Sequence, residues 1–541
     1  MNTLQTTFKT IVDSKLVQNI LETVIKIGVS EFCICPGARN AALIYPLIND
    51  TRIQTYNWPE ERSAAFFALG RIKATKRPVA IITTSGTAVG ELLPAVMEAY
   101  YTGLPLVVIS ADRPRRFRGS GAPQSAEQVG IFSHYLHLMQ DVQSGECVNL
   151  TKWSLEGPIQ LNVCLEEPID SECKNIRLSS DLNIDQKTQS TNTFQYDSDY
   201  SQFLKKVKFP FIIVGGLDAL DREAIINLLL HLQAPVYLEA HSGIREDNRI
   251  AHLKIQCVEK VLLHSNKNHY PIDGIFRIGN VPTLRFWRDL EEANSGLNIY
   301  SLSSLPFSGL SSVQIKKNSI NSFVEWALLQ PNEKKYPFFD WHNKDRQLQL
   351  EFETLFLNEP LAEPSLIHQL SKKIPLNAKV YLGNSLPIRE WDLAATHAMR
   401  YYQITASRGM NGIDGQLATF LGYCSDEQDN WAILGDLTTL YDMAAPWVVE
   451  QLGAMRINLV VINNQGGAIF NRKFEHPIFQ NPHHLSFKPF AEFWNWTYEK
   501  WDSIPCEISS CQGARLIELY PNQNATDSFW KSYQMMMESY D

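Results

Sequence analysis

Apolar residues along the chain alternate between helix-like and strand-like spacing, and this alternation predicts the fold class. Residues 15–28 repeat apolar side chains at the intervals of an amphipathic helix. The segments 30–35 and 104–109 are typical of strands, and the continuous apolar segment 79–82 is typical of a buried strand. The segment 88–101 between the last two has the length of a helix. Strands that alternate with helices predict a parallel sheet with helices on both faces.

The same alternation starts again twice. A second α/β segment begins with the apolar strand 209–214, and the glycine pair after it lacks the remainder of a dinucleotide-binding motif, so we predict only a tight turn there. The polar segment 178–202 and the proline-containing segment 330–339 predict linkers. We therefore predict an α/β fold with three doubly wound parallel-sheet domains, over residues 1–178, 203–335 and 345–541.

Two polar turns follow apolar segments of the third domain. Gly435-Asp436-Leu437 follows residues 431–434, and the run from Asn463 to Gly467 follows residues 457–462. In a strand–helix–strand crossover both turns lie at the carboxyl ends of neighbouring strands, where open α/β sheets bind ligands. A carboxylate, an amide oxygen and a backbone carbonyl suit Mg²⁺, which completes its shell with phosphate oxygens and water. Gly-Asp alone is equally typical of an ordinary turn, but the pair of turns predicts a site for a metal-bound diphosphate.

Composition excludes several classes of function. At 541 residues, and roughly 150 residues per domain, the chain has room for three or four domains. With 44% hydrophobic and 20% charged residues it is typical of soluble globular proteins, and a net charge of −9 argues against nucleic acid or anionic membranes as partners. Nine cysteines without a CxxC pair favour reduced thiols. Because no signal-peptide layout or long apolar stretch is present, we expect a cytoplasmic protein without membrane insertion.

A helix-length segment in the first domain places a glutamate beside small residues. Glu61 shares one helical face with Ala64, Ala65 and Ala68, whereas Glu60 is out of phase with them. The same pattern is typical of a surface acidic pair next to a small-residue core face. Small residues on that face would let the helix pack closely on a neighbour. The spacing alone does not decide between a functional Glu61 on such a helix and a surface acidic pair.

Both features resemble thiamine diphosphate-dependent enzymes. The turns resemble the metal-binding motif of that superfamily, Gly-Asp-Gly followed after a helix by Asn-Asn, with Leu437 in place of the last glycine. The resemblance implies that Asp436, the side chain of Asn464 and the carbonyl of Gly466 bind Mg²⁺ or Mn²⁺. It also implies that Glu61 bonds the aminopyrimidine ring of thiamine diphosphate, because a buried carboxyl group that resists ionisation shares its proton with the ring nitrogen. The implied site lies between the first domain of one subunit and the third domain of another, in a homodimer or homotetramer.

Seven further motifs resemble one family of this superfamily. In chain order they are residues 36–40, 84–88, 111–114, 121–124, 384–389, 407–415 and 466–470. They resemble the menaquinone-biosynthesis synthases that make 2-succinyl-5-enolpyruvyl-6-hydroxy-3-cyclohexene-1-carboxylate. Between residues 180 and 370 only 279–285 matches. The resemblance implies a transferase that decarboxylates 2-oxoglutarate and adds the remaining succinyl unit to isochorismate.

Both substrates of that family are dicarboxylates, and arginine presents a planar fork to carboxylates. Matching motif by motif implies substrate-binding roles for the polar residues Arg39, Asn40, Arg113, Gln124, Arg285, Ser385, Arg389 and Arg408. Gln124, Arg389 and Arg408 join Glu61 as implied catalytic residues. Ala38 stands where the family often has a serine, and either Asn40 or the backbone could replace its hydroxyl.

The resemblance also assigns three apolar residues to the cofactor. Ile413 matches the aliphatic residue that bends the cofactor from beneath. Ile469 and Phe470 would form an apolar wall near the reacting carbon, where exclusion of water helps a carboxylate to leave as CO₂.

Two other interpretations are compatible with the sequence. The first is another thiamine diphosphate enzyme, either a 2-oxoacid decarboxylase or an acetolactate synthase-like carboligase. A decarboxylase of small oxoacids would be expected to have fewer arginines, and an acetolactate synthase would carry flavin in a middle domain that shows no fingerprint for it here. The second is a catalytically inactive α/β scaffold or binding module, in which Glu61→Gln would leave the function intact.

Overall fold

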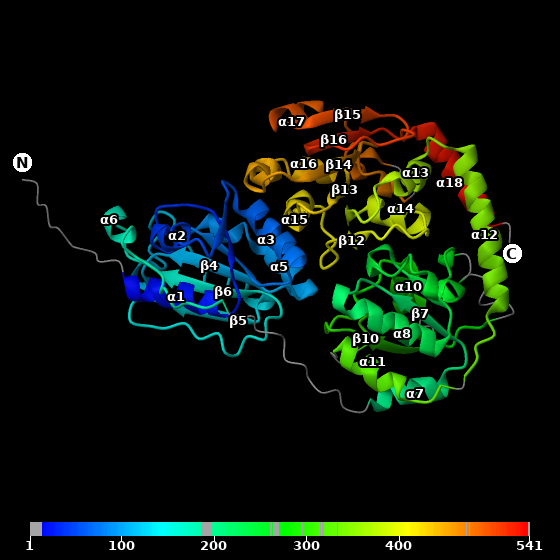
Figure 1. The fold of residues 1–541 in the computed structure, drawn as a ribbon, viewed down its shortest axis with the longest axis horizontal. Helices are drawn as coiled ribbons and strands as arrows, with labels where there is room; N and C mark the ends of the chain where they lie inside the picture. Colours follow the sequence, from blue (N-terminus) through cyan, green and yellow to red (C-terminus); the bar gives the residue numbers. More distant parts are fainter. Residues whose placement is uncertain are drawn as a thin grey trace, which may run out of the picture. The chain divides into compact units, whose positions relative to one another are not determined.

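A computed structural model describes residues 13–184, 197–259, 262, 270–293, 296–313, 315, 319–332, 334–471, 473–474 and 476–538 (Figure 1). The chain divides into two compact units. The first comprises Met1–Gln189 with Asp414–Ser425 and Leu440–Gly453, and the second comprises Ser190–Ile413, Asp426–Thr439 and Ala454–Asp541. All strand pairs within the three named sheets are parallel, so the predicted α/β fold class is confirmed.

The first unit is built on a six-stranded sheet in the order β2-β1-β3-β4-β6-β5. Its strands are β1 (Glu31–Ile34), β2 (Gln54–Asn57), β3 (Val79–Thr83), β4 (Leu106–Asp112), β5 (Leu138–Val142) and β6 (Ile159–Cys164). Its helical segments are α1 (Ser14–Lys26), α2 (Ala41–Ile48), α3 (Glu61–Thr75), α4 (Thr87–Gly90), α5 (Leu93–Thr102), η1 (Arg115–Phe117), η2 (Ser133–Tyr135), α6 (Asp170–Cys173), α15 (Gln416–Tyr423) and η6 (Ala445–Gln451).

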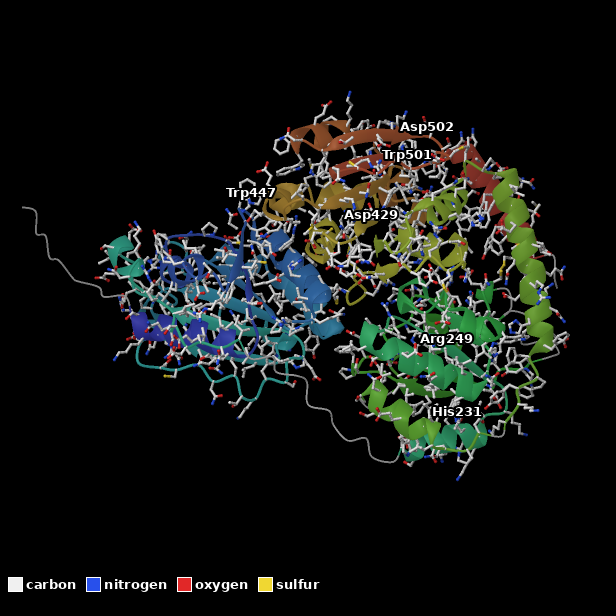
Figure 2. All side chains as sticks on the ribbon, viewed as in Figure 1. His231, Arg249, Asp429, Trp447, Trp501 and Asp502 are labelled. Atoms are coloured by element: carbon white, nitrogen blue, oxygen red, sulfur yellow. The ribbon has the colours of Figure 1, made fainter. Side chains whose placement is uncertain are left out.

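Helices cover both faces of this sheet because successive side chains of a strand point to opposite faces. The helices α1 and α2 share an apolar core with alternate strand residues, among them Phe32 and Ile82. Helix α3 contacts β1 and β3 and packs against α5. From η6, Trp447, labelled in Figure 2, donates its indole N–H to the carbonyl of Asn57 at 2.9 Å.

Local chemistry explains where these elements begin and end. Asp13 caps α1 by accepting hydrogen bonds from the backbone N–H groups of Lys15 and Leu16, each at 3.1 Å. The predicted helix over 88–101 is wrong as a single element, since it forms the two helices α4 and α5. Pro94 lies in the first turn of α5, where its missing N–H is tolerated.

The second unit contains two sheets. A four-stranded sheet in the order β10-β9-β7-β8 consists of β7 (Pro210–Val214), β8 (Val236–Leu238), β9 (Gly274–Ile278) and β10 (Asn298–Leu302). The helical segments described around it are α7 (Ser198–Lys206), η3 (Ala219–Asp221), α8 (Arg222–Leu232), η4 (Ala240–Ser242), η5 (Asn248–Leu253), α10 (Arg285–Ala293) and α11 (Ile320–Leu328).

The other sheet has six strands in the order β12-β11-β13-β14-β16-β15, the same sequence of crossovers as in the first unit. Its strands are β11 (Lys379–Leu382), β12 (Gln403–Thr405), β13 (Asp429–Gly435), β14 (Arg456–Ile462), β15 (Thr497–Trp501) and β16 (Gly513–Leu519). The helical segments are α12 (Phe339–Asn358), α13 (Glu363–Lys373), α14 (Leu386–Ala394), α16 (Asp436–Tyr441), η7 (Ala468–Phe470), η8 (Pro477–Phe479), α17 (Lys488–Phe493) and α18 (Gln523–Glu538). The predicted likeness of the first and third sheets is confirmed.

Several other sequence predictions can be compared with the structure. All nine cysteines are free thiols, as predicted. The predicted linker over 178–202 lies partly outside the described residues, and α7 occupies its end. Among the described helices, none has the length and apolar character needed to cross a membrane. The three domain boundaries remain predictions.

Candidate active site

The polar turns after β13 and β14 meet at the carboxyl edge of the third sheet. These strands pair in parallel up to Gly435 and Ile462, so the two turns leave the sheet side by side. Asp436 is buried, and its Oδ2 accepts a hydrogen bond from the Gly466 N–H at 2.9 Å. Burial raises the pKa of Asp436, while backbone N–H groups oppose this rise. A cation at the carboxylate would stabilise its charged form.

Asn464 is held in one orientation by a buried glutamate. Its Nδ2 donates to both carboxylate oxygens of Glu363, each at 3.0 Å, and Glu363 is only 3% exposed. The amide oxygen of Asn464 is therefore directed away from Glu363. Asn463 has a different role, because its amide nitrogen donates to Glu518 at 2.6 Å and holds the end of the strand.

A glycine turn completes this edge. Gly466 has φ = 141°, and a Cβ there would lie 2.5 Å from the carbonyl oxygen of Gln480, so the turn requires glycine. His483 places Nε2 at 3.2 Å from Oδ2 of Asp436. One buried carboxylate, one oriented amide oxygen and a tight glycine turn form a set of oxygen donors that fits a hard divalent cation carrying a diphosphate.

In the first unit, helix α3 separates the roles of the two neighbouring glutamates. Glu60 is the N-cap and accepts from the N–H groups of Arg62 and Ser63 at 3.0 and 2.9 Å. Glu61 lies in the first helical turn with a half-buried side chain, and burial raises its pKa. The carboxylate of Glu60 is thus used to cap the helix, and that of Glu61 takes no part in the cap.

Helix α3 packs very closely on α15. A Cβ at Gly70 would lie 2.1 Å from the Thr419 carbonyl oxygen, and one at Gly422 would lie 2.2 Å from the Phe67 carbonyl oxygen. The helices approach backbone to backbone at this crossing. The two glycines allow this close approach, and Ala64, Ala65 and Ala68 on the same helix are fully buried.

We expect Gly70→Ala to destabilise the protein by about 1–3 kcal/mol, because the new methyl group can fit only if the two helices move apart. Thermal or denaturant unfolding would measure the loss. Gly90→Ala is the matched control, since the nearest atom to a Cβ there lies 3.9 Å away. Equal stability of the two variants would contradict the close crossing.

Two predicted substrate residues lie in the turn after β1. The Arg39 guanidinium is 6% exposed, donates to the Leu165 carbonyl at 3.2 Å and pairs with Glu167. Asn40 is fully buried, and its amide accepts from the Gly37 N–H at 2.8 Å and donates to the Cys35 carbonyl at 2.9 Å. These two bonds fix the shape of the turn that carries Arg39.

Two others lie on the loop after β4. The Nε of Arg113 donates to the carbonyl of Pro123 at 2.8 Å, which ties the two ends of the loop together. Gln124 is exposed and has φ = 55°. A Cβ on Gly86 would lie 3.4 Å from Cα of Gln124, so the loop packs on the turn after β3.

In the second unit, Asn384 brings together the loops after β11 and β12. Its Nδ2 donates to the carbonyls of Ser407 and Gly412 at 2.9 and 2.7 Å, and its Oδ1 accepts from Arg408 at 2.8 Å. Arg389, one turn along α14, donates to the carbonyl of Ser385 at 2.5 Å. Arg408 is therefore bonded directly to buried Asn384, while Ser385 and Arg389 lie in the segment that follows Asn384.

The remaining predicted residues occupy separate positions. Arg285 begins α10 with a side chain 74% exposed, paired with Asp289 at 3.1 Å. Buried Glu239 accepts from the N–H groups of Thr283 and Leu284 and so holds the segment before Arg285. The three apolar residues are partly exposed and lie in the segment before α15 and in η7: Ile413, Ile469 and Phe470.

Sequence reasoning missed Glu363, His483 and Glu239. Each is distant in sequence from the group it holds, and none belongs to a recognisable short motif. For Asn384 a signal was present, since it begins the motif at 384–389.

The same strand order in two six-stranded sheets, an oxygen-donor turn and a glutamate helix define a thiamine diphosphate-binding α/β protein. Residues 14–131 match the family model of the thiamine pyrophosphate enzyme N-terminal TPP-binding domain. The X-ray structure of a thiamin diphosphate-dependent enzyme isolated from Mycobacterium smegmatis is similar in fold, with a TM-score of 0.70 and 14% identity over 95% of this chain and 100% of that one.

Curated relatives identify the family. A 2-succinyl-5-enolpyruvyl-6-hydroxy-3-cyclohexene-1-carboxylate synthase of Bdellovibrio bacteriovorus is 40% identical over 96% of this chain and 99% of its own length. The synthases of Akkermansia muciniphila and Bacillus pumilus are 34% and 27% identical, over 92% and 89% of this chain and 95% and 89% of theirs. The chain belongs to this family of thiamine diphosphate-dependent synthases, which confirms the family resemblance drawn from the motifs.

Proposed function

We propose that the chain decarboxylates 2-oxoglutarate with thiamine diphosphate and Mg²⁺ (or Mn²⁺) and transfers the remaining succinyl semialdehyde unit to isochorismate, as a step of menaquinone biosynthesis. The observation that carries the proposal is the oriented donor set of Asp436, Asn464 and Gly466 in a chain 40% identical to such a synthase. The free thiols suit a cytoplasmic location.

In this proposal, the residues at the carboxyl edge of the third sheet bind the metal-bound diphosphate. Asp436 supplies the charge, Asn464 the amide oxygen and Gly466 a carbonyl. When bound, the cofactor supplies an electron sink for the pair released on decarboxylation, which no side chain could provide. Glu61 of a second copy of the chain holds a proton at the aminopyrimidine ring, so self-association as a homodimer or homotetramer completes each site.

The chain's own polar residues would bind the two dicarboxylates. A protein with a net charge of −9 needs local guanidinium groups to attract them. We propose this role for Arg39, Arg113, Arg285, Arg389 and Arg408, with Gln124 and Ser385 as hydrogen-bonding partners and Asn40 shaping the turn of Arg39. Ile413 would support the cofactor, and Ile469 with Phe470 would exclude water from the reacting carbon.

The direct test incubates the protein with thiamine diphosphate, Mg²⁺, 2-oxoglutarate and isochorismate. We expect isochorismate to disappear and an adduct with the mass of the synthase product to form. Pyruvate in place of 2-oxoglutarate is the control. Equal use of pyruvate, or a yellow flavin spectrum of the purified protein, would favour an acetolactate synthase-like carboligase instead.

We expect Arg408→Ala to raise the KM of at least one dicarboxylate by about 10-fold or more, since a charge-assisted hydrogen bond contributes roughly 1.5–3 kcal/mol. Steady-state kinetics with each substrate varied in turn would measure this. The matched control is Arg249→Ala, a surface arginine that pairs with Glu223 and Asp247. An unchanged KM for both substrates would remove Arg408 from the site.

A further inference from the structure

The loop over residues 113–125, which we call the β4 loop, has little apolar anchorage. Apart from the short η1 segment it contains no regular helix or strand, and none of its side chains is buried. A segment without buried apolar contacts opens at low free-energy cost unless hydrogen bonds or ion pairs hold it. The β4 loop carries Arg113 and Gln124, so whatever holds it also sets the positions of these two side chains.

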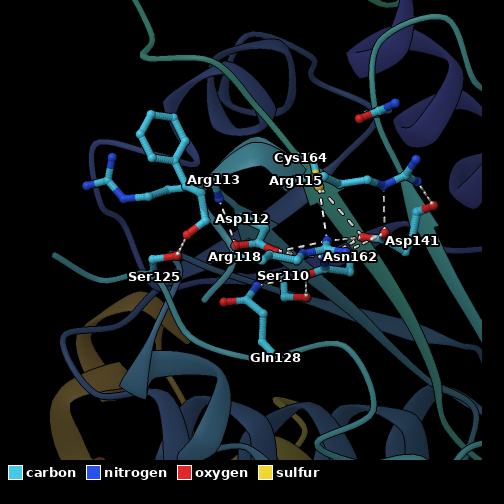
Figure 3. A network of polar contacts seen from close by, with 12 residues as sticks. Ser110, Asp112, Arg113, Arg115, Arg118, Ser125, Gln128, Asp141, Asn162 and Cys164 are labelled. Atoms are coloured by element: carbon cyan, nitrogen blue, oxygen red, sulfur yellow. Dashed lines mark hydrogen bonds and ion pairs between the residues drawn. The ribbon is translucent and has the colours of Figure 1, made fainter. Parts of the chain in front are cut away.

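One arginine of the loop reaches back to the sheet. Arg118 donates to both carboxylate oxygens of Asp141, at 2.6 and 2.9 Å, and to Oδ2 of Asp112 at 3.2 Å. The same guanidinium lies 3.3 Å from Sγ of Cys164. Its partners belong to three neighbouring strands, β4, β5 and β6, so a single side chain fastens the loop to the carboxyl edge of half the sheet (Figure 3).

The network of polar contacts around Arg118 extends to both Arg113 and the turn on which Gln124 packs. Asp112 is 1% exposed, and its Oδ1 accepts from the backbone N–H of Arg113 at 2.7 Å. Buried Asn162 donates to Asp112 and Asp141, at 3.0 and 2.8 Å, and accepts from Gln128 at 2.7 Å. Gln128 in turn accepts from the N–H of Gly86, on which Gln124 packs. The network thus holds Arg113 directly and reaches the other end of the loop through Gly86, on which Gln124 packs. Figure 3 shows its polar contacts from Arg113 and Asp112 to Asn162 and Gln128.

A metal ion is the competing interpretation of this cluster. Ligand atoms of Asp112, Asp141 and Cys164 lie within 4.8 Å of one another, a spacing that could hold one. Arg118 bonds to all three and already supplies the positive charge. A second arginine, Arg115, also donates to Asp141, at 2.8 Å. Burial alone would raise the pKa of Asp141, but the hydrogen bonds from Arg118, Asn162 and Arg115 lower it to about 2, so the carboxylate stays charged at neutral pH.

We propose that Arg118 is a positioning residue: by bridging Asp112 and Asp141 it holds the β4 loop so that Arg113 and Gln124 face the dicarboxylate substrates. The inference rests on the proposed function for its kinetic consequence. Lysine cannot replace this arginine fully, because an ammonium group cannot bond both oxygens of Asp141 and reach Asp112 in one fixed plane.

The test compares Arg118→Met and Arg118→Lys with Arg116→Met in the full-length protein. Arg116 is the matched control, since it lies in the same loop and pairs with both oxygens of Glu166, but its side chain is 58% exposed. Hydrogen exchange of residues 113–125 reports loop order. We expect exchange at least about 10-fold faster in Arg118→Met than in the wild type, an intermediate rate in Arg118→Lys and the wild-type rate in Arg116→Met.

Kinetics separate positioning from a general loss of structure. We expect Arg118→Met to raise the KM of at least one dicarboxylate by about 10- to 100-fold. Its affinity for thiamine diphosphate and Mg²⁺, measured by calorimetry, should equal that of the wild type. A merely structural role would lower the amount of active enzyme and leave KM unaltered. If Arg118→Met fails to fold, hydrogen exchange and KM measured on Arg118→Lys test the positioning role instead.

The outcomes distinguish this inference from the proposed function. Exchange rates equal in the Arg118 and Arg116 variants, or faster exchange with unchanged KM, would overturn the positioning role while the enzyme's activity stands. A wild-type protein that converts neither substrate would overturn the proposed function, and the exchange comparison would still decide whether Arg118 holds the loop.

Discussion

Replacing Glu61 by glutamine is expected to lower turnover by about 10²–10⁴-fold, the usual size of a general acid–base contribution. The carboxyl group lies in the first turn of α3, and burial raises its pKa. A raised pKa keeps a proton available for a ring nitrogen of the cofactor. Glutamine fills the same space but cannot exchange a proton, so we expect thiamine diphosphate and Mg²⁺ still to bind.

Glu60→Gln is the matched control for this prediction. Glu60 is adjacent in sequence, but its carboxylate caps the helix through the N–H groups of Arg62 and Ser63. Its loss should cost about 0.5–2 kcal/mol of stability and leave turnover near the wild-type value. Turnover and calorimetric cofactor binding, measured on both variants, test whether the loss of activity is specific to Glu61. Full activity of Glu61→Gln would exclude the proposed mechanism and favour the inactive-scaffold interpretation.

The sequence predicted the fold class because strand and helix signals were strong where the chain is buried. The turns at Asp436 and Asn464 could be placed at one edge from the strand–helix–strand pattern alone, since parallel strands bring their carboxyl ends together. The helix over 88–101 was predicted as continuous because its apolar spacing is regular. Pro94 favours a helix start, and the structure places the break just before it.

The residues that orient the site could not be predicted in the same way. Glu363 reaches Asn464 from helix α13, and Glu239 holds the segment before Arg285 from the end of β8. Such partners depend on tertiary packing, which a single sequence does not display as a local pattern. Helical phase favours Glu61 over Glu60 as the site residue, and the structure shows Glu60 as the N-cap of α3.

Asp436→Asn is expected to weaken the binding of thiamine diphosphate with Mg²⁺ by about 10²-fold or more, since loss of an outer-shell partner alone typically costs 10–100-fold in metal affinity. The substitution keeps the size of the side chain and removes the only charge among the three proposed ligands. Its Oδ2 also accepts from the Gly466 N–H at 2.9 Å, so the turn that would offer the carbonyl ligand loses a charged acceptor. Titration calorimetry measures the affinity directly.

Stability measurements give a second readout for the same variant. Ligand at 100 times its Kd stabilises a protein by about 2.7 kcal/mol, so the cofactor and Mg²⁺ should raise the Tm of the wild type and of Asp429→Asn but not that of Asp436→Asn. Asp429, labelled in Figure 2, begins the same strand at the end opposite the turn and pairs with Arg456 at 3.3 Å. A cofactor-dependent rise in Tm that persists in Asp436→Asn would place the metal elsewhere in the protein.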